Sequence, residues 1–198
     1  MTSPQAGCGR EAWLAAQSEA FRGLLGFEVL EWRGREMALD QDEAERPAWR
    51  LPTVEMLQLD RLEAVGAETS ICVTTAQNDD HFGLRVQAPW IIDWQSGFDL
   101  SVPVDGSPFA DDPVSIFRDV RLPQIPVGKI GDVSVRLSEE GGDIGTVTLL
   151  VGNAVVSMRA AEVYPHLDGS IAIIDLDESI LVHVDGAHPD DQIAGLHV

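Results

Sequence analysis

The stretch Ile144–Val163, IGTVTLLVGNAVVSMRAAEV, decides the fold class. Two runs rich in β-branched residues, 144–151 and 154–163, lie on either side of Gly152-Asn153. This dipeptide is typical of the tight turns that join adjacent antiparallel strands. The stretch therefore predicts a β-hairpin, and it carries the clearest strand signal in the chain.

Further strand patterns cover most of the remaining chain. Alternating or β-branched runs predict strands at 27–32, 36–39, 54–64, 71–75, 84–87, 90–94, 98–104, 131–137, 171–174 and 180–184. Residues 54–64 also fit a helical spacing, and their resemblance to the alternating run at 131–137 decides for a strand. Between the first two runs, Arg33-Gly34-Arg35 predicts a hairpin turn.

One helix is predicted, at residues 10–25. Its apolar residues recur at three- and four-residue spacings, and Gly23 and Gly26 mark its end. Strands do not alternate with helices elsewhere, which argues against a parallel sheet. We therefore expect a mainly β protein (α+β by element count), in which antiparallel β units form a barrel or a sandwich with one N-terminal helix. Residues 1–9 are expected to be disordered and residues 187–198 to form a tail.

The chain also shows signs of internal duplication. Gly26–Val29 recurs as Gly97–Leu100, and Arg50-Leu51-Pro52 recurs as Arg121-Leu122-Pro123 at the same offset. Val102–Gly106 returns later as Val182–Gly186. These matches predict a first β repeat at 26–96 and a second at 97–186. In the second repeat, the last strand is expected to close the fold by pairing with an otherwise exposed edge.

The charge balance narrows the class of partner. The chain has 33 acidic and 13 basic residues, a formal net charge of −20, and the deficit is spread along its whole length. Such a field repels nucleic acid and anionic membranes and attracts basic proteins or cations. The alternative interpretation is that acidity only maintains solubility or reflects a saline cytoplasm.

Known catalytic signatures and targeting segments are absent from the sequence. It contains no nucleophile elbow, phosphate loop, dinucleotide fingerprint or Cys-x-x-Cys pair. Cys8 and Cys72 are not expected to form a disulfide framework, and we expect neither a signal peptide nor a membrane span, because no run is long and apolar enough. We expect a cytoplasmic protein, and the absence of these signatures favours binding over catalysis.

The best candidate site lies near the C-terminus, where four of the five histidines fall in the last 33 residues. His183 and Asp185 are two residues apart in a predicted strand, so they project to one face. An imidazole and a carboxylate on one face could ligate a divalent metal or act as an acid–base pair, or they could be ordinary strand residues in contact with solvent.

Two other segments contain candidate site residues. Asn78–His81 places oxygen ligands in a loop, although the calcium-loop spacing is missing. Trp90, Ile92 and Trp94 share a strand face, where they form either a buried aromatic ladder or an apolar binding patch.

We therefore expect an acidic cytoplasmic binding module, non-catalytic and without a cofactor, that engages a basic protein partner in the manner of an immunity or inhibitor protein. Neither nucleic acid nor membrane is expected as a partner. The alternative is a small metal- or ligand-binding β protein or enzyme with its site near His183 and Asp185. A structural subunit that assembles through strand edges is a third reading.

Overall fold

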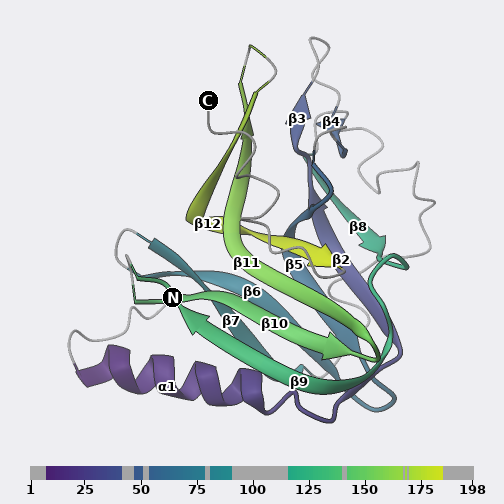
Figure 1. The fold of residues 1–198 in the computed structure, drawn as a ribbon, viewed down its shortest axis with the longest axis vertical. Helices are drawn as coiled ribbons and strands as arrows, with labels where there is room; N and C mark the ends of the chain where they lie inside the picture. Colours follow the sequence, from purple (N-terminus) through teal and green to yellow (C-terminus); the bar gives the residue numbers. More distant parts are fainter. Residues whose placement is uncertain are drawn as a thin grey trace.

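Most of the described chain forms β-strands, and one amphipathic segment forms a helix (Figure 1). The computed structural model describes residues 8–41, 47–50, 54–78, 81–90, 116–139, 142–166, 168 and 170–184. The elements are α1 (Cys8–Arg22), β1 (Glu28–Val29), β2 (Glu31–Met37), β3 (Asp40–Gln41), β4 (Pro47–Ala48), β5 (Leu57–Val65), β6 (Ser70–Asn78), β7 (His81–Trp90), β8 (Phe117–Arg121), β9 (Gly128–Leu137), β10 (Ile144–Val151), β11 (Ala154–Pro165) and β12 (Ile171–Val184). The prediction of a mainly β protein with one N-terminal helix is confirmed.

Ten of the described strands form one antiparallel sheet in the order β1-β9-β10-β11-β12-β5-β2-β8, to which β6 and β7 are added beside β5. The sheet branches at β5. Residues 57–59 of β5 pair with β12, whereas residues 61–65 pair with β6. Strands β6 and β7 therefore diverge from β12 and fold over the other layer, where β7 packs against β10, β11 and β12. The two layers face each other, and the described strands do not close into a barrel.

The main core fills the space between the layers. It consists of buried apolar side chains from both layers and from the end of the helix, including Phe21, Leu59, Leu84, Ile144, Val147, Met158 and Ile180. A second, smaller cluster lies on the other face of β11 and β12 and contains Leu39, Val54, Met56, Ala161, Val163 and Leu181. Because neighbours in a strand point to opposite faces, Ala160 and Ala161 belong to different clusters.

Helix α1 lies along β7, β9 and β10 (Figure 1). It begins at Cys8, earlier than predicted, and ends at Arg22, before Gly23. Its buried side is fixed at two points: the Gln17 Oε1 atom accepts a hydrogen bond from the Val86 amide at 2.9 Å, and Arg10 pairs with the buried Asp143 at 3.2 Å. The helix therefore covers the side of β7 that no described strand occupies.

The predicted hairpin turn at Arg33-Gly34-Arg35 is wrong, because β2 runs through these residues without interruption. A Cβ atom at Gly34 would lie 2.9 Å from Leu122 Cδ1 and 3.2 Å from the Arg61 carbonyl oxygen. Glycine is needed there because other elements approach closely, and not because the chain turns.

Internal duplication is not confirmed. β1 of the expected first repeat pairs with β9 of the second, and β8 of the second repeat pairs with β2 of the first. Strands of the two expected repeats are therefore interleaved in one sheet. The recurring segments 97–100 and 102–106 lie outside the described residues.

The expected closing strand occupies a different position from the one predicted. β12 lies between β11 and β5, so it joins two groups of strands inside the sheet and does not cap an outer edge. The prediction of two separate strands at 171–174 and 180–184 is replaced by one long strand with an irregularity in its middle. The hairpin at Gly152-Asn153 is confirmed, and β10 and β11 pair from Val151 and Ala154 outward.

Candidate functional site

The β11–β12 hairpin extends beyond the rest of the sheet, at the top of Figure 1. We call residues 161–166, 168 and 170–179 the arm. At its base, Ala160 pairs with Ile180, but the next residue, Ala161, pairs with Asp175. Residues 176–179 are therefore inserted into β12 and have no pairing partner in the β11–β12 register. Leu176 in this insertion has a φ of 57°, a backbone conformation that leucine rarely adopts. Its side chain is buried.

Side-chain contacts hold the insertion in place. Thr75 Oγ1 of β6 donates a hydrogen bond to the Glu178 carbonyl oxygen, and Tyr164 Oη donates to Asp177 Oδ2 at 2.9 Å. Ser179 Oγ donates to Glu162 Oε2 at 3.2 Å. These contacts join the insertion to β6 and to the β11 strand of the arm, in the region that contains Glu162, Asp177 and Glu178.

The arm is strongly acidic and partly apolar on its surface. Residues 161–179 contain five carboxylates and no lysine or arginine. Tyr164 is 38% exposed and Ile174 is 48% exposed. The register places Tyr164 opposite Ala172, so Tyr164 and Ile174 are diagonal neighbours on one face of the arm.

Three titratable groups of the arm have shifted pKa values. Burial raises the pKa of Glu162, with Asp177 and Glu178 adding to the effect and the Ser179 hydrogen bond opposing it. Burial, together with the hydrogen bond to Asp177, raises the pKa of Tyr164 to about 12. Hydrogen bonds from Ser170 lower the pKa of Asp168, so this carboxylate at the end of the arm is ionised at neutral pH.

His183 is buried, so its interpretation as an ordinary strand residue in contact with solvent is wrong. It is 6% exposed, and within the described part of the chain neither of its ring nitrogens has a hydrogen-bond partner. It lines a pocket of about 420 Å³ together with Arg50, Glu55 and Gln124. A buried imidazole without a partner is costly unless something binds it, so this pocket is a candidate ligand site.

The metal site predicted at His183 and Asp185 stays a prediction, because Asp185 lies outside the described residues. Among the residues that the structure describes, no group of three or more histidine, cysteine or acidic side chains could hold a metal ion. His166 lies at the end of the arm, beyond the last β11–β12 pair, whereas His183 pairs with Ser157. At about 3.3 Å per residue, the two are separated by roughly 30 Å along β11. The structure does not bring these two histidines together.

The other predicted site segments are only partly described. Asn78 pairs with His81 across the β6–β7 hairpin, and Asp79 and Asp80 between them lie outside the described residues. Trp90 ends β7, and its predicted partners Ile92 and Trp94 also lie outside.

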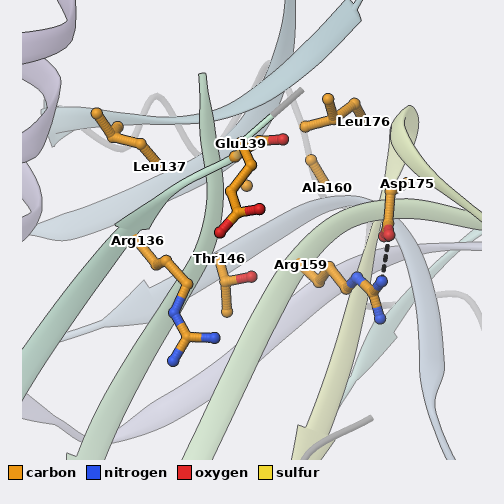
Figure 2. Close-up of a pocket in the computed structure, with 10 residues that line it drawn as sticks. Arg136, Leu137, Glu139, Thr146, Arg159, Ala160, Asp175 and Leu176 are labelled. Carbon is orange, nitrogen blue, oxygen red and sulfur yellow. Dashed lines mark hydrogen bonds and ion pairs between the residues drawn. The ribbon is translucent and has the colours of Figure 1, made fainter. Parts of the chain in front are cut away.

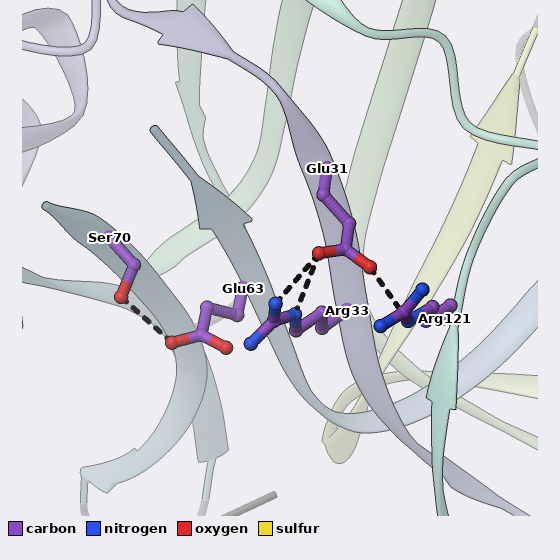
Figure 3. Close-up of polar contacts among 5 residues, drawn as sticks. All are labelled: Glu31, Arg33, Glu63, Ser70 and Arg121. Carbon is purple, nitrogen blue, oxygen red and sulfur yellow. Dashed lines mark hydrogen bonds and ion pairs between the residues drawn. The ribbon is translucent and has the colours of Figure 1, made fainter. Parts of the chain in front are cut away.

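A group of charged side chains, of which Arg33 and Glu63 are buried, serves the fold. Glu31 receives hydrogen bonds from Arg33, the shortest at 2.7 Å, and pairs with Arg121 at 3.0 Å (Figure 3). Glu63, opposite Arg33 in the sheet, accepts a hydrogen bond from Ser70 at 2.8 Å. Because these partners are supplied from within the sheet, we assign the group a structural role.

We also assign structural roles to Glu36 and Cys72. Glu36, 1% exposed at its side chain, pairs with Arg50 and with Arg118. The buried thiol of Cys72 has a pKa raised to about 11, mainly by burial, so it is protonated at neutral pH and a poor nucleophile.

A second pocket, of about 360 Å³, lies over β9 to β12 (Figure 2). Two arginines, Arg136 and Arg159, line it together with Glu139 and Asp175. Sequence reasoning did not identify this site. The alternation in 134–137 and 157–160 could have indicated it, because it places both arginines on the strand faces that point away from the main core.

Comparison of the chain with protein-family models, with curated proteins and with solved structures finds no match. The one described helix is too short and too polar to cross a membrane.

Proposed function

We propose that the protein is an acidic, non-catalytic binding module whose arm engages a basic protein partner, as an immunity or inhibitor protein would. The observation that carries this proposal is that Tyr164 and Ile174 are exposed on the arm, where residues 161–179 include five carboxylates and no lysine or arginine. Protein interfaces concentrate their binding energy in apolar and aromatic anchors, and charges around such anchors select the partner and speed association.

Rigidity of the arm supports the same reading. Tyr164 holds Asp177, Thr75 holds the backbone at Glu178, and Ser179 holds Glu162. A surface whose side chains are already ordered loses less conformational entropy on binding. The arm therefore presents the Asp177 carboxylate in a fixed position, while the contact between Ser179 and the buried Glu162 holds the arm from within.

Another apolar surface, around the turn at 122–127, supports the proposal less well. Leu30 and Val127 are exposed there, beside a pocket of about 430 Å³. Its charged neighbours Glu31 and Arg121 pair with each other. This surface has no net charge with which to select a basic partner, whereas the arm does.

The experiment is affinity capture with the full chain, followed by binding measurements on the purified captured protein. We expect a basic partner whose affinity falls as salt rises, because exposed charges are screened. The variants Ile174→Ser and Glu178→Lys should weaken binding about tenfold or more. The control Glu68→Lys makes the same charge change at an exposed site outside the arm and should leave affinity nearly unchanged. Equal losses in Glu178→Lys and Glu68→Lys, or binding that is indifferent to salt, would contradict the proposal.

A second candidate function, the binding of a metal or small ligand near His183, is favoured by the unpartnered imidazole in its pocket. A thermal-shift series with zinc, nickel and cobalt ions tests the metal form, since a ligand that binds only the folded state raises Tm. The rise should disappear in His183→Ala and persist in the control His81→Ala. No rise with any ion would remove the metal reading.

A further inference from the structure

The pocket over β9 to β12 is built around a row of three side chains (Figure 2). Thr146 in β10 lies opposite Arg136 in β9 on one side and opposite Arg159 in β11 on the other. Neighbouring strands are about 4.8 Å apart, so the two arginine backbones are roughly 10 Å apart with a threonine hydroxyl between them. In a chain with 13 basic and 33 acidic residues, two guanidinium groups in one row are unexpected.

Two irregularities of the sheet shape this pocket. Gly145 is an extra residue in β10, because Ile144 pairs with Leu137 and Thr146 already pairs with Arg136. On the other side, the insertion at 176–179 begins with Leu176, whose positive φ turns the chain at the rim. Bulges and strained residues are found preferentially beside functional sites, where they redirect side chains.

The charges in the pocket are of both signs. Asp175 pairs with Arg159 and so fixes its guanidinium group. Arg136 and Glu139 are exposed, and neither forms a hydrogen bond or an ion pair within the described residues. Figure 2 shows the Glu139 carboxylate above Thr146, the residue that lies between the two arginines. The pocket thus offers one anchored guanidinium, one guanidinium that is still available and one available carboxylate.

We propose that this pocket binds a free amino acid. The ligand carboxylate interacts with Arg136, Arg159 and the Thr146 hydroxyl, since guanidinium groups present paired donors that match a carboxylate. The ligand ammonium group interacts with Glu139, and its side chain lies against Leu137 and Leu176, which line the pocket. A volume of about 360 Å³ is within the range of small-molecule sites. The pocket shares Asp175 and Leu176 with the base of the arm, but amino-acid binding does not require the arm to bind a partner.

The test is calorimetric titration of the full chain with each of the twenty standard amino acids. The best ligand is then compared with its decarboxylated amine, its deaminated acid and inorganic phosphate. We expect binding in the micromolar to millimolar range and about tenfold or greater loss for each analogue, because each lacks one of the two charges or their spacing. Arg136→Gln should weaken the amino acid about tenfold or more. The control Arg22→Gln, at an exposed arginine of α1, should not.

Glu139→Gln provides the second arm of the test. It should weaken the amino acid but leave the deaminated acid unaffected, because only the ammonium contact is lost. Circular dichroism and Tm show whether each variant is folded. The proposal is overturned if no amino acid binds with a Kd below about 10 mM, if phosphate or the deaminated acid binds as tightly as the amino acid, or if Arg22→Gln causes the same loss as Arg136→Gln.

Discussion

The amide nitrogen of Val86 in β7 donates a hydrogen bond to the Oε1 atom of Gln17 in α1, over 2.9 Å. Among the described strands, β7 has a partner, β6, on one side only. The Gln17 side chain thus takes the place that a neighbouring strand would fill for this amide. Val86 is buried, so without Gln17 its amide would have neither a strand partner nor water as a hydrogen-bond acceptor.

We expect Gln17→Ala to lower the free energy of unfolding by about 1–3 kcal/mol, the cost of leaving a buried donor without an acceptor. Urea denaturation measures the change, and the Val86 amide should exchange faster with deuterium. Gln17→Glu keeps an acceptor and should retain most of the stability. The control Glu19→Ala, at an exposed site on the same helix, should be nearly neutral. An equal loss in both alanine variants would mean that the contact with Val86 is unimportant.

Gly34 tests the close approach of β2, β5 and the residues after β8. Gly34→Ala places a Cβ atom 2.9 Å from Leu122 Cδ1 and 3.2 Å from a backbone oxygen, so we expect a loss of about 1–3 kcal/mol from overpacking. Gly131→Ala is the matched control, since its nearest contact would be an ordinary 3.8 Å. Denaturation that shows no difference between the two variants would contradict the close approach of Leu122 and Arg61 to Gly34.

Glu36 tests whether the buried ion pairs hold β2, β8 and the segment at Arg50 together. Glu36→Ala leaves Arg50 and Arg118 without their shared partner, and we expect a loss of about 2–4 kcal/mol because the carboxylate is buried. Arg50→Ala should cost less, since Arg50 is half exposed and Arg118 still pairs with Glu36. A larger loss in Arg50→Ala than in Glu36→Ala would contradict this ranking.

Glu162 gives a prediction of pH dependence. Because burial raises its pKa, the folded protein binds this proton more tightly than the unfolded chain does. The resulting stabilisation is complete below the ordinary carboxyl pKa of about 4.3 and is lost as pH rises through the raised value. Glu162→Gln should therefore have a higher Tm than the original chain at pH 7, and the difference should vanish near pH 4. The opposite trend, with a deficit of the variant that grows toward pH 7, would show that the charged form is stabilised.

Local sequence patterns predicted several elements because their causes are local. β-branched alternation around Gly152-Asn153 specifies the β10–β11 hairpin, and the spacing of apolar residues specifies α1. Gly34 was misread because its cause is distant: it lies in contact with Leu122, far along the chain. The branch at β5 and the central place of β12 depend on pairing between remote segments, which no local pattern encodes.

The candidate sites were predictable to different degrees. The carboxylates of the arm are visible in the sequence, but the insertion at 176–179 and the exposure of Ile174 follow from the β11–β12 register. The strand pattern identified His183 as a candidate. Its surroundings could not be predicted, because they come from β5 and from distant residues such as Arg50 and Gln124. Arg136 and Arg159 come together only because two hairpins place β9 and β11 on either side of β10.

The claim that the arm binds a basic partner is tested most directly by hydrogen–deuterium exchange of the full chain with and without the purified partner. Exchange is expected to slow in 161–165 and 171–179 on complex formation, and to stay unchanged around Glu68 and in α1. Protection that maps to other segments, in a complex that demonstrably forms, would contradict it.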